Sequence, residues 1–176
     1  MNRQFTITIF SENHSGLLNR ITIIFTRRKM NIESITTAKS EIPGIHRYNI
    51  VVEATQDQVE KVVGQIDKQV EVIRAYLSQD DEIIHREVAL YKVLNRPGAR
   101  EKLEKVVDSH GAKIIRDEKD YFAVELCSRE GEIDILLKDL QPFGVCEFAR
   151  SGRVAVTKAM DHMNDYLLAL EDECSC

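Results

Sequence analysis

The chain has 176 residues, of which 43% are hydrophobic and 30% charged, and its formal net charge is −5. This is the composition of an ordinary globular protein, long enough for one large domain or two small ones. The densest basic cluster is Arg27-Arg28-Lys29, and cations in a last helical turn are accounted for by the helix dipole. We therefore expect no nucleic-acid partner.

No apolar run approaches the roughly 20 residues of a transmembrane helix, and the N-terminal residues lack the apolar core of a signal peptide. These features predict a cytoplasmic protein with no membrane partner. Cys127 and Cys146 lie within apolar runs and Cys174 and Cys176 at the tail, so no disulfide framework is predicted. The tail's Cys-Ser-Cys could bind a metal or form an intermolecular disulfide, although a reduced terminus explains it more simply.

Hydrophobic periodicity in the first half alternates between the two-residue repeat of strands and the longer repeat of helices. Pro43-Gly44 is a strong turn signal and predicts an antiparallel hairpin. The predicted elements are a strand at 4–10, a helix over 17–25, strands at 31–40 and 46–54, a helix over 59–70 and a strand at 70–77. This βαββαβ order is the ferredoxin-like arrangement of four antiparallel strands covered by two helices.

The second half repeats the same order. Strands are predicted at 86–94, 112–116, 121–127 and 145–149, with helices over 103–110 and 133–140. The fold class is therefore α+β, with two ferredoxin-like βαββαβ domains. We expect domains at 1–78 and 86–158, a linker at 79–85 around the acidic run Asp80-Asp81-Glu82, and a C-terminal helix and tail at 159–176. The helix is predicted from an apolar stripe at heptad-like spacing: Val156, Met160, Met163, Leu167 and Leu170.

Catalytic motifs are missing from the pattern. The sequence has no Gly-x-Ser-x-Gly, Walker loop, Gly-x-Gly-x-x-Gly or His-Glu-x-x-His. Its histidines are scattered without the spacing of metal ligands: His14, His46, His85, His110 and His162. We predict a binding module, not an enzyme, with no metal and no cofactor bound by this chain.

The first predicted strand ends in the corner Glu12-Asn13-His14-Ser15-Gly16, which delivers the N-terminus of the first helix. Free backbone N–H groups there favour a carboxylate, Gly16 leaves room for close approach, and Asn13 offers both a donor and an acceptor. Asn31 begins the second predicted strand, which we expect beside the first, so that its amide faces the same crevice or crosses to a partner subunit. The same residues also fit a plain helix cap and a tight turn. Pattern alone leaves both interpretations open.

The stretch ENHSGLLNRITIIFTRRKMNIESI, residues 12–35, closely resembles the ACT-domain signature of the small regulatory subunit of acetolactate synthase (acetohydroxyacid synthase). REVALYKV, at 86–93, resembles the strand that opens this family's second domain, and EFARSGRV, at 147–154, resembles its closing segment. The resemblance spans residues 2–158 in the family's order.

The resemblance implies a regulatory subunit without catalytic activity, whose first domain is an ACT domain. Its partner would be a catalytic large subunit carrying thiamine diphosphate, Mg²⁺ and FAD, which it would activate and make sensitive to feedback by a branched-chain amino acid, most often valine. ACT domains typically pair side by side, so a homodimer with effector at its interface is implied. The implied effector-binding residues are those of the corner and of the two apolar positions that follow it, together with the start of the second strand: Asn13, His14, Ser15, Gly16, Leu17, Leu18, Asn31 and Ile32.

One departure concerns Lys29, where family members usually carry Gly. A left-handed residue ending the helix would suit Gly; either a Lys adopts this conformation at a cost of about 1 kcal/mol or more, or the helix ends differently.

Two other classes of protein would need different features. A stand-alone ACT-type amino-acid sensor would not need the second domain, which we expect to serve activation. A metal-responsive regulator would need a His/Cys cluster and a DNA-binding element, and the sequence pattern offers neither.

Overall fold

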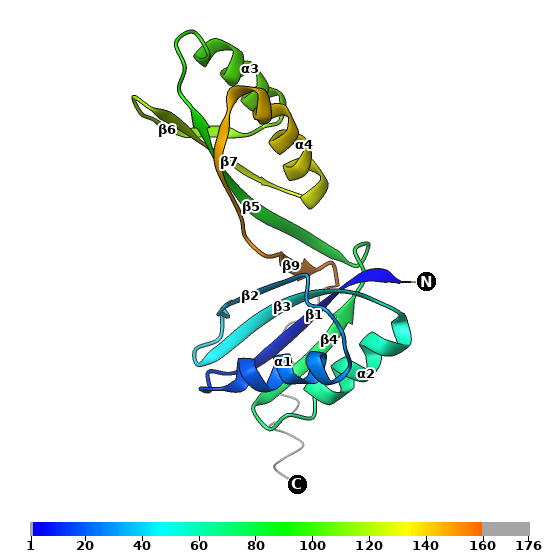
Figure 1. Ribbon diagram of the computed structural model, residues 1–176. Helices are drawn as coiled ribbons and strands as arrows, with labels where there is room; N and C mark the ends of the chain where they lie inside the picture. Colours follow the sequence, from blue (N-terminus) through cyan, green and yellow to red (C-terminus); the bar gives the residue numbers. More distant parts are fainter. Residues whose placement is uncertain (1, 160–176) are drawn as a thin grey trace.

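The computed structural model describes residues 2–159, which form two lobes joined end to end (Figure 1). The first lobe contains β1 (Arg3–Glu12), α1 (Leu17–Arg27), β2 (Ser34–Lys39), β3 (Ile45–Ala54), α2 (Gln56–Ile66) and β4 (Val72–Ser78). Its four strands are antiparallel in the order β2-β3-β1-β4. The predicted βαββαβ order is confirmed.

The prediction that the second strand lies beside the first was wrong. β3 lies between β1 and β2, and it pairs with both of them along its length. The hairpin turn around Pro43-Gly44 joins β2 to β3, and the crossover through α1 leaves room for β3 in the middle of the sheet. β2 is consequently an edge strand.

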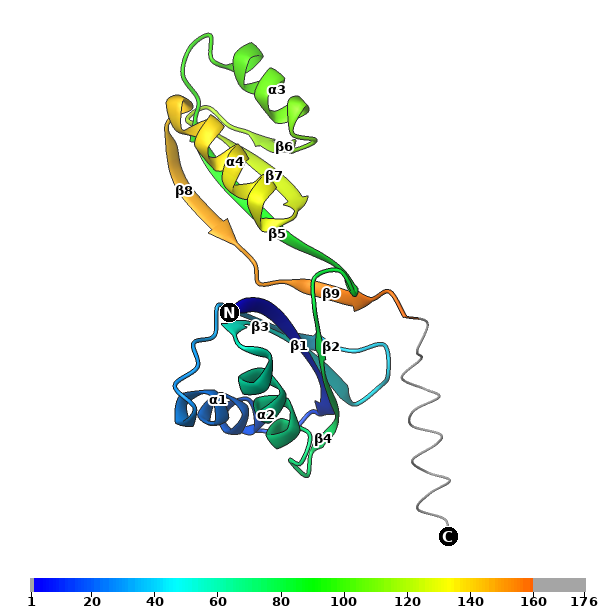
Figure 2. The same ribbon diagram turned by 90° about the vertical axis from the view of Figure 1, so that its right-hand side faces the viewer.

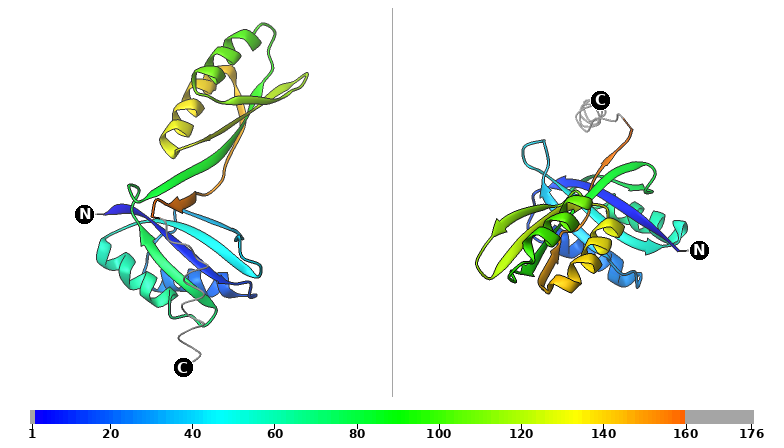
Figure 3. Two further views of the ribbon diagram at one scale, coloured as in Figure 1. Left: turned by 180° about the vertical axis from the view of Figure 1, so that it is seen from behind. Right: turned by 90° about the horizontal axis from the view of Figure 1, so that it is seen from above.

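Both helices of the first lobe cover one face of the sheet (Figure 3). Alternate residues of β1 point into this face, where they meet apolar stripes of α1 and α2. The start of α2 is fixed by a capping box, in which Thr55 and Gln58 bond each other's backbone and side-chain groups. The core comprises Phe5, Ile7, Ile9, Leu17, Ile21, Phe25, Tyr48, Ile50, Val52, Ala54, Val59, Val62, Ile66 and Val72.

The second lobe repeats the arrangement with β5 (Ile83–Leu94), α3 (Arg100–Ser109), β6 (Lys113–Asp117), β7 (Tyr121–Ser128), α4 (Glu130–Leu140), a 3-10 turn (Gln141–Phe143) and β8 (Val145–Arg150). Its strand order is β6-β7-β5-β8, again antiparallel. The buried Tyr91 hydroxyl donates to the carbonyl of Ile133 over 2.9 Å and so ties β5 to α4. The second ferredoxin-like unit is therefore also confirmed.

A ninth strand, β9 (Val154–Thr157), was not expected. It pairs with the first four residues of β5, from Ile83 opposite Thr157 to Arg86 opposite Val154. β5 begins three residues earlier than predicted to make this ladder, directly after the turn 79–82. Figure 2 shows β9 between the lobes, on the face of the first sheet opposite its helices. We call residues 151–158 the strap.

The strand β9 also corrects the predicted C-terminal stripe at its first member. Val156 was expected on a helix but lies in β9. Val154 and Val156 are exposed and Ala155 is buried, which is the two-residue repeat of a strand. The remaining members of the stripe, together with His162, Cys174 and Cys176, lie outside the described residues. No helix within residues 2–159 is long and apolar enough to cross a membrane.

Candidate functional site

The corner, residues 12–16, is held by its backbone. The N–H of Glu12 donates to the carbonyl of Glu71 over 2.9 Å, and the N–H of Asn13 donates to the carbonyl of Gly44 over 3.1 Å. These bonds fasten the end of β1 to the segments beginning β4 and β3. The side chains of residues 12–15 are left exposed, so the corner presents polar groups from a fixed backbone.

Gly16 is the N-cap residue of α1 and has the left-handed φ of 85°, which favours glycine. No side chain caps this helix start, so neither Asn13 nor Ser15 has the capping role that the sequence left open. A Cβ at Gly16 would meet no atom within 4 Å, which means that the space beside the first turn is open. The positive end of α1 is thus free to meet an anion.

Electrostatics beside the corner are set by Arg20 and Glu71. The Arg20 guanidinium donates to the Glu71 carboxylate over 2.5 Å, and His14 Nδ1 lies 4.0 Å from the same oxygen. The hydrogen bond from Arg20 holds the pKa of Glu71 below its usual range. Sequence reasoning missed this pair, although Arg20 is the final residue of the ENHSGLLNR segment. Glu71 gave no signal because it lies immediately before β4, 51 positions further along the chain.

The three apolar residues predicted to bind effector differ in their exposure in the structure. Leu17 is fully buried in the core, Ile32 is half-buried against the same core, and Leu18 is 40% exposed. Leu18 is therefore the predicted aliphatic side chain that faces outward beside Gly16. Lys29 has a φ of 52°, so of the two possibilities left open at this position the structure has a Lys in the left-handed conformation.

Asn31 is exposed and follows α1, whereas Asn13 and Gly16 precede it. Because α1 has 11 residues, its two ends are separated by about 16 Å at 1.5 Å per residue. The sheet also separates them: Glu12 pairs with Ile45 at one end of β3, and the N–H of Glu33 donates to the carbonyl of Val51 near the other end. One chain therefore does not bring Asn13 and Asn31 together, because they flank opposite ends of α1, which is labelled in Figure 1.

A cleft of about 660 Å³ lies elsewhere, on the helix-free face of the first sheet beside the strap. Phe10 and Tyr76 line it, with the guanidiniums of Arg47 and Arg74 stacked over the two rings at 5.1 and 5.2 Å from the centroids. None of the eight predicted effector residues lines this cleft. Within residues 2–159, no three His, Cys, Asp or Glu side chains group as ligands for a metal ion.

Comparison with known proteins agrees with this architecture. Residues 7–74 match the family described as "AHAS small subunit-like ACT domain", and residues 86–159 match "Small subunit of acetolactate synthase". The acetolactate synthase small subunit of Bacillus subtilis (strain 168) is 34% identical over 159 residues, covering 90% of this chain and 91% of that protein. The acetolactate synthase small subunit 2, chloroplastic, of Arabidopsis thaliana is 32% identical over 156 residues, covering 89% of this chain and 32% of that longer protein.

A solved structure has the same two-lobe fold. The crystal structure of the acetolactate synthase small subunit from Thermotoga maritima superimposes with a TM-score of 0.82 and 27% identity, covering 90% of this chain and 99% of that one. The fold and the family match over residues 7–74 define a protein built on an ACT domain. The chain belongs to the acetolactate synthase small-subunit family.

Proposed function

We propose that this chain activates the catalytic large subunit of acetolactate synthase and makes it sensitive to feedback by a branched-chain amino acid, with valine the first candidate. Family membership supports the partner, because the relatives are named as small subunits of that enzyme. Thiamine diphosphate, Mg²⁺ and FAD would be bound by the large subunit. The cytoplasmic location stays a prediction.

The separation of Asn13 from Asn31 is the observation that carries the site proposal. In a two-fold dimer whose α1 helices lie antiparallel, the Asn13–Gly16 end of one helix meets the Asn31 end of its partner. Two identical sites result, each built from both chains. The effector therefore bridges the two ACT domains and stabilises their pairing.

The side of the ACT domain formed by α1 and β2 suits this pairing. β2 is an edge strand with one side of its backbone unpaired within the sheet. Leu18 and Ile23 on α1, together with Ile35 on β2, are apolar and exposed. A homodimer through this side would cover both the apolar side chains and the open edge.

The chemistry of the corner fits an amino-acid effector. The uncapped first turn of α1 offers backbone N–H groups to an α-carboxylate, and the Asn13 side-chain carbonyl accepts from an α-ammonium. Leu18 supplies apolar surface for a branched aliphatic side chain, with Asn31 of the partner subunit closing the site. His14 and Ser15 complete its polar rim.

The second lobe supports a role in activation. Val88, Leu90 and Leu94 lie on one face of β5 and are exposed, with the partly exposed Lys92 among them. Ala89, Tyr91 and Val93 on the other face are buried beneath α3 and α4. The three exposed apolar residues therefore form an apolar strip on the helix-free face of the second sheet. We assign this strip to the catalytic subunit. A stand-alone ACT sensor is disfavoured, because the second lobe itself matches the acetolactate synthase family.

Mixing two defective variants tests the shared site. Asn13→Ala and Asn31→Ala homodimers each lack one residue in both sites, so both should fail to bind valine in calorimetric titration. A mixed dimer, however, carries one site with both native residues. We expect unfolding and refolding the two variants together to restore about a quarter of the wild-type sites, because half of the dimers are mixed and each has one intact site.

Valine, leucine and isoleucine would be titrated in turn into the wild-type chain, both alone and with the catalytic subunit. No recovery of binding in the mixed sample would show that each site is built from one chain and would contradict the proposed dimer. Retention of full binding by both variants would remove the corner as the effector site. Failure of the wild-type chain to alter the activity of the large subunit would overturn the proposed function.

A further inference from the structure

The junction between the two lobes contains a buried arginine that belongs to neither core. Arg153, the residue preceding β9, is 2% exposed. Its guanidinium donates to Gln4 Oε1 over 2.6 Å, to Thr6 Oγ1 over 3.0 Å and to Asp80 Oδ1 over 2.8 Å. Gln4 and Thr6 lie on β1, and Asp80 lies in the turn from β4 to β5. One side chain thus bonds the central strand of the ACT sheet and the chain crossing between the lobes.

Thr6 lies on the helix-free face of the ACT sheet, because its neighbours Phe5 and Ile7 point into the core. Thr6 is itself fully buried, so the strap covers this part of the face. Two further contacts fasten the strap. Arg47 on β3 donates to the carbonyl of Ala155 over 2.6 Å, and Gly152 lies against Thr36 and Ile35 of β2.

The charge of Arg153 makes this contact specific. A guanidinium removed from water is stabilised only while its acceptors stay in place, because a buried charge that loses partners is costly. Its Nε already has no acceptor, so the three bonds to Gln4, Thr6 and Asp80 carry the compensation. A shift of β1 relative to the strap would stretch two of these bonds.

Strand β1 connects this contact to the corner. Arg153 bonds to residues 4 and 6 of β1, and the corner begins at Glu12, the last residue of the same strand. At about 3.3 Å per residue, Thr6 and Asn13 are separated by about 23 Å along one strand. That strand is paired on both sides and buries Phe5, Ile7 and Ile9, so its two ends are joined by a packed, continuous element.

We propose that Arg153 is the positioning residue that fixes the second lobe to the ACT domain, and that effector bound at the corner acts on the catalytic partner through this contact. The inference rests on the proposed function for its regulatory part. Arg153 touches neither the effector nor the catalytic subunit. It converts a change at the ACT dimer into a change in the orientation of the second lobe.

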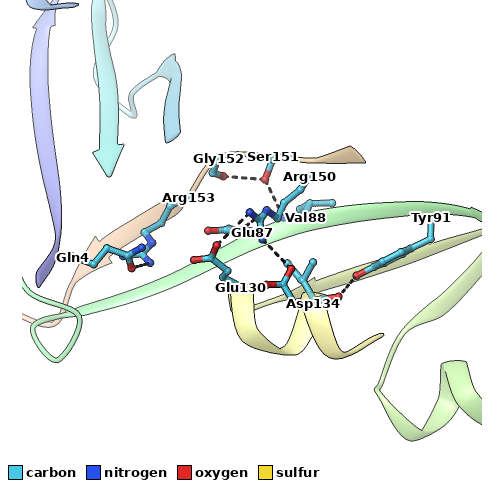
Figure 4. A network of polar contacts seen from close by, with 11 residues as sticks. Gln4, Glu87, Val88, Tyr91, Glu130, Asp134, Arg150, Ser151, Gly152 and Arg153 are labelled. Carbon is cyan, nitrogen blue, oxygen red and sulfur yellow. Dashed lines mark hydrogen bonds and ion pairs between the residues drawn. The ribbon is translucent and has the colours of Figure 1, made fainter. Parts of the chain in front are cut away.

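Arg150, the last residue of β8 and the one immediately before the strap, provides a matched control. Its guanidinium lies 3.5 Å from Glu87, 3.2 Å from Glu130 and 3.3 Å from Asp134, all in the second lobe. Figure 4 shows the contrast: Arg153 reaches Gln4 on β1, while Arg150 turns toward the acidic side chains around α4. Arg150→Met therefore removes a nearby arginine but leaves the bonds of Arg153 to Gln4, Thr6 and Asp80 in place.

The test uses the full chain with the acetolactate synthase large subunit, comparing wild type, Arg153→Met, Arg153→Lys and Arg150→Met. For each, valine binding is measured by calorimetry, and inhibition is measured as activity over a valine titration carried to saturation. Allosteric coupling is typically about 5–150-fold. We therefore expect Arg153→Met to bind valine within about threefold of wild type while its half-inhibitory concentration rises at least about tenfold. Arg153→Lys should be intermediate, since an ammonium lacks the fork that holds several acceptors at once, and Arg150→Met should remain inhibited.

A variant that is only less stable would lose valine binding and inhibition to a similar extent. Weakened inhibition with valine binding retained is therefore the decisive result. Thr6→Val is a second variant that keeps Arg153 and removes one acceptor with little change of shape, and it should weaken inhibition in the same direction. Inhibition of Arg153→Met at wild-type valine concentrations would overturn the inference.

A readout on the isolated chain keeps the two proposals separate. Spin labels on exposed positions of α2 and α3 report the distance between the lobes. Arg153→Met should broaden the wild-type distance distribution, and an unchanged distribution would overturn the positioning role even if the catalytic subunit proved not to respond. A wild-type chain without effect on the large subunit would instead overturn the proposed function, with the positioning role decided by the distances alone.

Discussion

Thr6 accepts a hydrogen bond from Arg153 over 3.0 Å, although 147 positions separate the two residues in the chain. Both are almost completely buried, so the boundary between the lobes has a small polar interior of its own. The chain crosses this boundary at the turn 79–82 and again at Gly152, and Arg153 bonds both to Thr6 in the ACT sheet and to Asp80 in the crossing turn. The lobes are therefore joined by specific side-chain contacts as well as by the chain.

Gly152→Ala should destabilise this junction. An added Cβ would meet Thr36 Oγ1 at 2.4 Å and the carbonyl oxygen of Ile35 at 3.1 Å, so the strap or β2 must shift. Thermal unfolding should show a lower Tm for this variant. Gly64→Ala is the matched control, because it lies in α2 with no atom within 4 Å of the added Cβ and should stabilise the helix by about 0.5–1 kcal/mol. Equal effects of the two substitutions would contradict the crowded contact.

Lys29→Gly should stabilise the chain. Lys29 has a φ of 52°, which costs a residue with a Cβ about 1–2 kcal/mol. Part of that gain is lost because glycine gives the unfolded chain more freedom, so we expect a net increase of about 0.5–1 kcal/mol. Urea unfolding checks the value, with Lys68→Gly, a position without positive φ, as the control. A loss of stability in Lys29→Gly would show that its side chain makes contacts that outweigh the backbone strain.

Acid should weaken the junction through His85. This residue lies on β5 opposite Ala155 of β9, is 6% exposed, and has a buried Nδ1 without a hydrogen-bond partner. Burial, followed by the nearby Arg153 charge, lowers the pKa of His85. Because its folded pKa lies below the unfolded value of about 6.5, the unfolded chain binds more protons as pH falls through that value, and stability falls with it.

Denaturant unfolding at pH 7.5 and pH 5.5 measures this effect. His85→Gln replaces the ring with a neutral side chain, so we expect a smaller drop in the free energy of unfolding than in wild type. An identical pH dependence in the two proteins would mean that His85 contributes nothing to it.

Leu90→Asp should weaken association with the catalytic subunit. Leu90 is 44% exposed on the helix-free face of the second sheet, between Val88 and Leu94. A carboxylate placed at an apolar interface is desolvated without a partner, which is costly. Sedimentation with the large subunit checks the loss, and valine binding should be unaffected. Ile135→Asp, on the exposed side of α4, is the control and should associate normally; equal loss in both variants would refute the assignment of this strip.

Much of the fold could be predicted because its signals are local. Pro43-Gly44 sets the hairpin, and the two-residue repeat of residues 4–10 sets β1, which the structure extends to Arg3–Glu12. β9 could not be predicted from its own four residues, since its pairing with Ile83–Arg86 depends on how the two lobes come together. Val156 was assigned to a helical stripe because the spacing to later apolar residues was read without this distant partner.

The candidate site was predictable in its residue types but not in its assembly. Gly16 was expected to allow close approach of a ligand or a tight turn, and the structure places it at the start of α1 with a φ of 85°. The position of Asn31 depended on strand order, because β3 rather than β2 lies beside β1. The burial of Leu17 depended on which face of α1 meets the sheet, and neighbouring Leu18 has the opposite outcome. Arg153 gave no signal as a contact residue, because its three partners are all at least 73 positions away in the chain.

The length of α1 has a consequence for the proposed feedback. If each effector molecule touches the first turn of one helix and the residue following the other, occupancy and pairing are linked by mass action. A dilute subunit then needs more amino acid to reach the same occupancy, because some of the binding energy is used to bring two chains together. The abundance of this small protein, and not only the level of the end product, would set the threshold at which the pathway slows.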